Sequence, residues 1–269
     1  MCNLLKVSTS GYYKYLPQGL SSRDVMNIAL DQEITALFKQ YEGIYGYRRI
    51  YREITMHASL NRVRRRMIAL GLYAVIKKKY QASPKSCVGT RYAANLLDQD
   101  LNTTAPNQKW ISDITEMKVN ARKLYLAVII DLYSRKVIGW SMSNRMTAEL
   151  ACDALRMAMR NRGYPNGVML HSDRGSQYTS KIYQTLLTAY GLICSMSAKG
   201  CCYDNSACES FFATLKKEHV YRNKFSSWEA AKSSIFKYIE VFYNRIRLHS
   251  SIEYLSPLQF ESKQLAIAA

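Results

Sequence analysis

Three acidic residues stand where carboxylates commonly do chemistry. Asp113 lies in an alternating segment, Asp173 follows a short expected strand, and Glu209 lies in a segment with helical periodicity. A 35-residue spacer, residues 174–208, separates the second acid from the third. Mg²⁺ prefers carboxylate oxygens, and two such ions about 4 Å apart promote in-line displacement at phosphorus. Because three clustered carboxylates would repel one another, we expect divalent cations between them.

The segment around Glu209 predicts a helix with an apolar stripe and a polar flank. At about 100° per residue, Asn205, Glu209 and Lys216 fall together beside the stripe. A lysine two turns beyond a metal-binding carboxylate is well placed to contact a phosphate, and a solvated helix face is the alternative. The stripe that must face the core comprises Cys208, Phe211, Phe212 and Leu215.

A mixed α/β domain is needed to bring these acids together. Alternation and short apolar runs predict strands, and apolar residues recurring every three or four positions predict helices. The order of three strands, a helix, a strand, a helix and a strand is typical of such a domain. The expected strands are 109–119, 124–130, 136–142, 167–171 and 192–196, and the expected helices are 147–161 and 180–190.

A long helix is expected near the C-terminus. Ser226 and Glu229 have the spacing of a capping box, which predicts that the helix begins there. Its apolar stripe comprises Trp228, Ala231, Ile235, Tyr238, Ile239, Phe242 and Ile246.

Positive charge is concentrated in the N-terminal part of the chain. The 38 Lys and Arg exceed the 20 Asp and Glu by 18, and residues 39–80 contain eleven basic and two acidic residues. This balance favours a nucleic-acid partner, because neutralising phosphates releases counterions. Two expected helices, 47–54 and 61–70, suggest a helix-turn-helix-like module, and a basic solvated face is the alternative. The expected DNA contacts are Arg64, Arg65 and Arg66.

Length and composition exclude several other classes. With 269 residues, 48% hydrophobic and 22% charged, the chain is neither a disulfide-stapled scaffold nor globally disordered. The longest apolar run, Leu124–Ile130, falls far short of the roughly 20 residues that span a bilayer, so no membrane partner is expected. Seven scattered cysteines without a CxxC pair fit reduced thiols in a cytosolic compartment.

The ordered set of motifs resembles the DDE transposases of bacterial insertion sequences, in particular the second-frame (OrfB) product of two-frame elements. The resemblance covers almost the whole chain. Its motifs are Ser8–Tyr13, Tyr45–Ile50, Trp110–Thr115, Asp131–Arg135, His171–Gly175, Asp204–Asn205, Glu209–Phe212, Thr214–Lys216 and Tyr243–Arg247.

This resemblance implies an α/β, RNase H-like mixed-sheet catalytic core, similar to that of retroviral integrases, preceded by a small helical DNA-binding module. It implies metal-dependent cleavage and joining of DNA at an element's ends, with a 3′-hydroxyl attacking a phosphodiester in line. Asp113, Asp173 and Glu209 match the family's catalytic, metal-binding triad, for which we expect Mg²⁺ or Mn²⁺ as two ions.

The resemblance also implies partners and a location. The expected partners are double-stranded terminal-repeat and target DNA, further copies of the chain on that DNA, and the first-frame product or its fusion. In such elements the first frame supplies a helix-turn-helix and a coiled coil. We therefore expect a bacterial, cytoplasmic and nucleoid-associated protein.

The chain is expected to divide into three parts. Residues 1–80 form the basic helical module, and residues 106–269 form the catalytic core with its C-terminal helix. Between them, residues 81–105 show turn residues and no sustained period, which is typical of a linker.

Other polar residues have more than one interpretation. Asp131, at a strand end, either caps a turn or joins the metal site. Asp204 and Asn205 either cap the helix of Glu209 or support the site. The adjacent cysteines at 201 and 202 lack the second pair that zinc requires, and their role is open. His171 either approaches the site or packs in the core.

Two further functional classes remain. One is a DNA-binding protein without catalysis, such as a partner or inhibitor of a full-length transposase. The other is a nuclease on the same fold, because a fold alone does not fix function. The intact triad favours the transposase.

Overall fold

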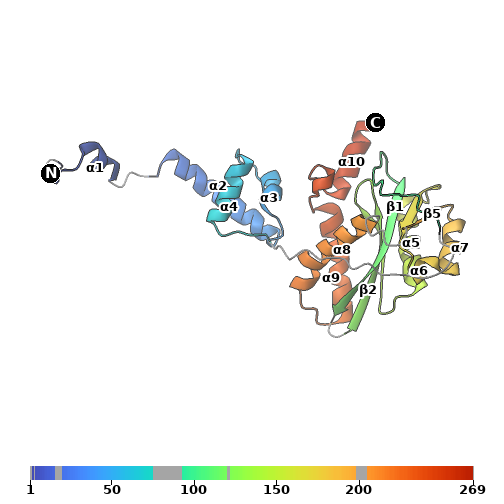
Figure 1. Ribbon diagram of the computed structural model, residues 1–269. Helices are drawn as coiled ribbons and strands as arrows, with labels where there is room; N and C mark the ends of the chain where they lie inside the picture. The colour runs from blue at the N-terminus through green and yellow to red at the C-terminus, as the bar shows by residue number, and fades with distance from the viewer. Residues whose placement is uncertain are drawn as a thin grey trace. The chain divides into compact units, whose positions relative to one another are not determined.

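The structure, a computed structural model, describes residues 2, 4–15, 20–74, 93–119, 122–197 and 205–268. The chain forms two compact units, Met1–Ile76 and Lys77–Ala269, and the first is helical whereas the second contains a sheet (Figure 1).

The first unit contains α1 (Thr9–Tyr15), α2 (Ser22–Gln40), α3 (Tyr47–Glu53) and α4 (Leu60–Ala69). The last two confirm the helices expected at 47–54 and 61–70, and Gly71 follows α4 with a φ of +66° that suits glycine. The 19-residue α2 was not expected, although a capping box of Ser21 and Asp24 begins it. The buried side chains shared by α2, α3, α4 and the turn before α3 are Leu30, Ile34, Tyr45, Ile50, Val63 and Met67.

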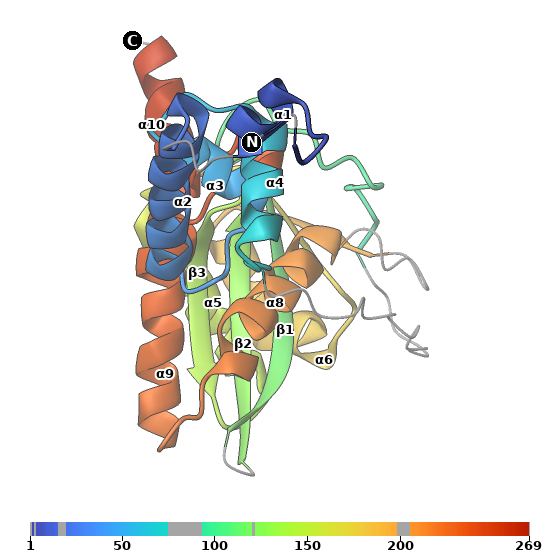
Figure 2. The same ribbon diagram turned by 90° about the vertical axis from the view of Figure 1, so that its left-hand side faces the viewer.

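The second unit is built on a five-stranded mixed sheet in the order β3-β2-β1-β4-β5. β1 pairs with β2 and β2 with β3 in antiparallel fashion, whereas β4 and β5 extend the sheet in parallel from β1. In Figure 2 the first three strands lie side by side in this order. All five expected strands are confirmed: β1 (Lys109–Val119), β2 (Arg122–Asp131), β3 (Val137–Ser143), β4 (Met169–Ser172) and β5 (Ile193–Met196).

Helices cover both faces of this sheet, as Figure 1 shows. One layer contains α5 (Ala148–Arg162), α6 (Ser176–Thr179) and α7 (Lys181–Ala189). The other contains α8 (Ser206–Glu218), α9 (Trp228–Lys237) and a π-helical turn, η3 (Tyr238–Tyr243). Gly139 of β3 permits close packing against α5, because a Cβ there would lie 2.3 Å from the Ala154 carbonyl oxygen.

The C-terminal helix differs from its expected form. α9 begins one residue later than the predicted box, because the Ser227 hydroxyl, not that of Ser226, accepts from the Ala230 amide at 3.0 Å. The expected continuous helix becomes π-helical at η3, and Ile246 at the end of its stripe is exposed. Two 3₁₀ turns, η2 (Val220–Arg222) and η4 (Ser250–Ile252), and α10 (Pro257–Ala268) complete this layer.

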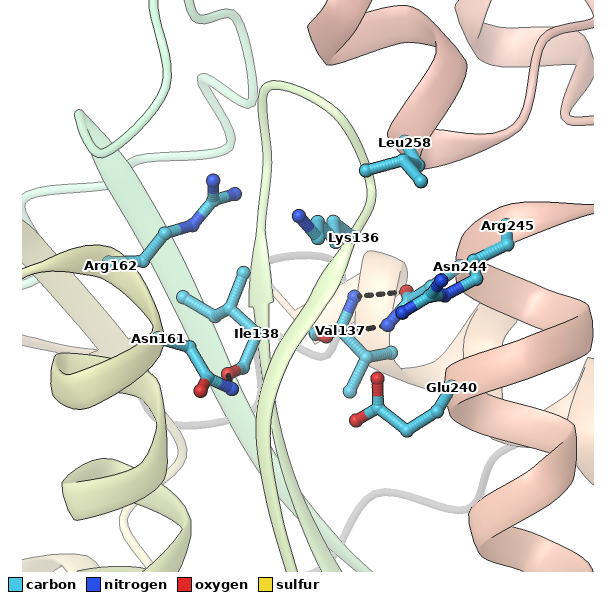
Figure 3. A pocket seen from close by; sticks show the side chains of 9 residues that line it. All are labelled: Lys136, Val137, Ile138, Asn161, Arg162, Glu240, Asn244, Arg245 and Leu258. Carbon is cyan, nitrogen blue, oxygen red and sulfur yellow. Dashed lines mark hydrogen bonds between the residues drawn. The ribbon is translucent and has the colours of Figure 1, made fainter.

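Asn244, directly after η3, holds the free edge of the sheet. Its Oδ1 accepts from the Val137 amide at 3.0 Å, and its Nδ2 donates to the Val137 carbonyl at 2.9 Å. Figure 3 shows this pair beside a cavity of about 260 Å³ between β3, α5 and the C-terminal layer. The side chain therefore replaces the strand that β3 lacks at the sheet edge.

Residues 93–105, part of the expected linker, lie against the sheet unit. Leu97 is buried in its core, and the Leu96 and Leu97 amides donate to the Ser195 hydroxyl at 3.0 and 3.3 Å. The rest of the expected linker, residues 81–92, lies outside the described residues. Among the helices that the structure describes, none has both the length and the apolar character to cross a membrane.

Candidate active site

Neighbouring parallel strands carry the first two acids. Ser112 of β1 pairs with Ser172 of β4, so Asp113 and Asp173 are the next residues along the two strands. Side chains alternate along a strand, and Asp113 therefore lies on the same sheet face as the buried Ile111. Asp113 is partly buried and Asp173 is exposed.

The helix α8 places Glu209 over β1. The Cys208 thiol donates to the Ile111 carbonyl at 3.7 Å, two residues before Asp113. The expected apolar stripe of Cys208, Phe211, Phe212 and Leu215 is buried against the sheet, whereas Glu209 in the first turn is exposed. The helical phase derived from the sequence is therefore correct.

The three carboxylates act on one another electrostatically. The pKa of Asp113 is raised to about 8, first by burial and then by the charges of Asp173 and Glu209, against the opposing effects of the Ile114 amide and the Lys216 ammonium. The Ile114 amide donates to Asp113 Oδ1 at 2.7 Å. Asp113 thus lies in a negative field that a cation would relieve.

The three acids do not form a closed ligand set in this structure. Within the described ranges, no three His, Cys, Asp or Glu side chains gather closely enough to hold a metal ion. The Asp173 carboxylate instead accepts from the Gly175 amide at 2.9 Å, in the turn after β4. The donor chemistry nevertheless fits a hard divalent cation, because all three side chains offer carboxylate oxygens.

Lys216 lies on the same side of α8 as Glu209. Its side chain is partly buried, and burial lowers its pKa, while the charges of Asp113 and Glu116 act in the opposite direction. An ammonium group beside an acidic site is suited to hold a substrate phosphate near the carboxylates.

Buried hydroxyl groups form hydrogen bonds with residues of β1 and β4. These bonds were not expected from the sequence. Ser112 donates to the Val128 carbonyl at 3.1 Å, which leaves its oxygen to accept from the buried Tyr178 hydroxyl at 3.0 Å. His171 is fully buried between Ser195 and Ser197, at 2.9 and 3.0 Å, so it packs in the core. A lone serine in a short apolar strand is the only sequence signal for Ser195.

The remaining candidates are also placed. Asp131 is fully buried and accepts from the Tyr133 and Asn107 amides and from Arg162, so it caps a turn. Asn205 is the N-cap residue of α8 by position, but its side chain makes no capping hydrogen bond. Residues 201, 202 and 204 lie outside the described residues.

The three N-terminal arginines do not share one environment. Arg64 and Arg65 are exposed on α4, whereas Arg66 forms an ion pair with Asp31 of α2. The sequence could not distinguish them, because Asp31 lies 35 positions earlier in the chain.

Comparison with known families and proteins agrees with this architecture. Two models described as "Integrase core domain" match residues 103–202 and 209–265, and one described as "HTH-like domain" matches residues 27–80. The transposase InsF for insertion sequence IS3A of Escherichia coli (strain K12) is 44% identical, over 99% of this chain and 94% of its own length. The insertion element IS600 uncharacterized 31 kDa protein of Shigella sonnei is 39% identical over the full length of both.

Solved structures of retroviral integrases are also similar. The catalytic core domain of HTLV-2 integrase in complex with magnesium is 19% identical, with a TM-score of 0.44, over 58% of this chain and 97% of that one. A chain of the simian T-cell lymphotropic virus intasome in complex with PP2A regulatory subunit B56 gamma is 16% identical, with a TM-score of 0.49, over 85% of this chain and 74% of that one.

The sheet order and the integrase core models confirm the expected RNase H-like core, and the third model confirms the helical module before it. Through its near-complete match to InsF, the chain belongs to the insertion-sequence transposases that combine a helix-turn-helix-like DNA-binding domain with an integrase core.

Proposed function

We propose that this transposase cuts and joins DNA at the ends of its element with Asp113, Asp173 and Glu209 as a divalent-metal triad. The observation that supports the proposal is that Asp113 lies in β1, Asp173 directly follows the adjacent strand β4, and Glu209 lies on the helix packed above them. Mg²⁺ is the expected cofactor, as two ions, and Mn²⁺ would suit the same oxygen ligands. When bound, such ions activate the attacking oxygen and stabilise the leaving one.

The reaction is an exchange of phosphodiester bonds. The oxygen of a 3′-hydroxyl forms a bond to the scissile phosphorus and loses its proton, while the opposite phosphorus–oxygen bond breaks and the leaving oxygen gains one. The three carboxylates hold the cations, and Asp113, the most buried of them, fixes the site to the sheet. Lys216 holds a phosphate of the DNA strand next to the carboxylates.

The rest of the chain supplies DNA and partners to this site. Residues 1–80 act as the DNA-binding module, residues 81–92 as a linker, and residues 106–269, with residues 93–105 packed against them, as the catalytic core. The substrates are the terminal repeats and a target duplex. Several copies of the chain assemble on that DNA near the nucleoid, with the first-frame product or as a fusion to it.

A product analysis tests this function. The full chain is incubated with labelled duplexes that carry the ends of its own element, with Mg²⁺ or with a chelator. Metal-dependent nicks at the element ends followed by joined products support transposition. Nicks without joining would indicate a nuclease, and retention of DNA without any cleavage would indicate a non-catalytic binding protein; either result refutes the proposal.

A further inference from the structure

Two arginines of α4 form side-chain hydrogen bonds with the neighbouring helix α2. Arg62 Nη2 donates to Asn27 Oδ1 at 2.9 Å, and Arg66 Nε donates to Asp31 Oδ1 at 2.7 Å. Arg66 also pairs through Nη2 with the second carboxylate oxygen, and this bond raises its pKa. Arg62 and Arg66 are four residues apart, as are Asn27 and Asp31, so both bonds link the same side of α4 to α2.

The face of α4 opposite its buried side chains is exposed to solvent. Val63 and Met67 form the buried face of α4, and at about 100° per residue Arg65 lies on the opposite face, with Asn61 and Ile68 beside it. All three outward residues are exposed. In the part of the chain that the structure describes, the side chains of Asn61 and Arg65 have no hydrogen-bond or ion-pair partner, unlike Arg62 and Arg66.

The remaining edge of α4 adjoins α3. The Arg64 guanidinium lies over the Tyr47 ring, 5.8 Å from its centroid. On α3, Arg48 and Arg52 are four residues apart and both are exposed. In helix-turn-helix proteins the first helix crosses the DNA backbone while the second lies in the major groove. Basic residues along α3 and this edge of α4 match the phosphates that such docking presents.

We propose that α4 is the recognition helix and that Asn61 and Arg65 read base edges in the major groove. Arg64, with Arg48 of α3, contacts phosphates. Arg62 and Arg66 position the helix from α2 and do not touch DNA. Asn and Arg form paired hydrogen bonds with adenine and guanine respectively, so the recognised DNA sequence contains both bases near each other. This inference rests on DNA binding by the helix-turn-helix-like domain and not on the catalytic triad.

Selection from randomised duplexes tests the base readers. The full chain is used to enrich a pool of duplexes with a randomised core, and affinities are then measured for the selected and a scrambled duplex. Arg65→Ala should weaken binding to the selected duplex roughly 5- to 150-fold and binding to the scrambled duplex much less. Asn61→Ala should relax selection at a neighbouring position. The proposal is overturned if the wild type enriches no sequence, or if Arg65→Ala weakens both duplexes equally.

Salt dependence separates the phosphate contact from the base readers. Arg64→Ala should weaken both duplexes by the same factor and lower the log–log salt slope by about 1. Arg23→Ala removes an exposed arginine from the first turn of α2 and is the matched control, with an unchanged slope expected. Equal slopes for Arg64→Ala and wild type would remove Arg64 from the interface.

A double-mutant cycle tests the positioning role of Arg66. All three tryptophans, at 110, 140 and 228, lie in the second unit, so fluorescence monitors that unit alone, and a circular dichroism transition without a fluorescence change belongs to the helical unit. Arg66→Ala and Asp31→Ala should each lower the helical midpoint by about 4–8 °C, and the double variant little more. At temperatures where the helices are intact, Arg66→Ala should keep the wild-type salt slope and selectivity. Loss of either with the fold intact would show that Arg66 contacts DNA.

Discussion

Replacing Asn244 by alanine should destabilise the sheet unit. Asn244 is 3% exposed, and its side-chain amide bonds both backbone groups of Val137, at 3.0 and 2.9 Å. The adjacent Tyr243 packs edge-on against Phe211 of α8, with ring centroids 4.8 Å apart. The substitution therefore loosens both the sheet edge and the support of the helix that carries Glu209.

The expected loss follows from the two hydrogen bonds. Each contributes about 1 kcal/mol net, and an orphaned buried backbone group costs about 1–3 kcal/mol. Water that enters from the adjacent cavity of about 260 Å³ can satisfy part of this demand. We expect the free energy of unfolding of the sheet unit to fall by about 2–4 kcal/mol. Urea unfolding followed by tryptophan fluorescence measures it, because every tryptophan lies in this unit.

Asn161→Ala is the matched control for this prediction. Its amide makes a single hydrogen bond, from Nδ2 to the Ile138 carbonyl at 2.9 Å, and the residue is exposed. We expect a loss of about 1 kcal/mol or less there. If Asn244→Ala cost no more than this control, the interpretation of Asn244 as a substitute for a missing edge strand would be wrong.

Two further predictions concern pH and substrate binding. Burial raises the pKa of Glu261, but the hydrogen bond and charge of Arg162, with Ser134 and Lys136, outweigh it and hold this pKa below its usual 4.5. The stabilisation is fully present above pH 4.5 and is lost as the pH falls through the lowered pKa. Glu261→Gln should therefore make the free energy of unfolding, measured from pH 6 downward, fall less steeply with decreasing pH. Lys216→Ala should raise the DNA concentration for half-maximal activity more than it lowers the saturated rate, with partial recovery in Lys216→Arg; unchanged values of both would exclude the phosphate contact.

The sequence predicted elements whose signals are local. The apolar run of β2 and the apolar stripe of α8 are buried, as their sequence patterns predict. The helix α2 was missed because its apolar residues show no clear face: Val25, Met26 and Ile28 are exposed, whereas Leu30 and Ile34 are buried.

Other features depend on contacts between distant residues. The π-helical turn η3 ends directly before Asn244, whose partner Val137 lies 107 residues earlier, so no local pattern predicts it. Arg64, Arg65 and Arg66 look alike in sequence, and contacts with the distant residues Asp31 and Tyr47 separate their environments. The proximity of Asp113 to Asp173 likewise follows from the pairing of β1 with β4, which sequence spacing alone does not specify.

The central claim is that three carboxylates carry the reaction, and activity measurements on conservative variants test it most directly. Asp113→Asn, Asp173→Asn and Glu209→Gln each remove one charged oxygen ligand while keeping side-chain size. We expect each variant to bind element-end DNA as the wild type does, to unfold at a similar urea concentration, and to lose strand cleavage and joining in Mg²⁺ by several kcal/mol in barrier height, about a thousandfold or more. A folded variant that kept more than about a tenth of the wild-type rate, a difference of only 1.36 kcal/mol, would contradict the account by removing that acid from the triad.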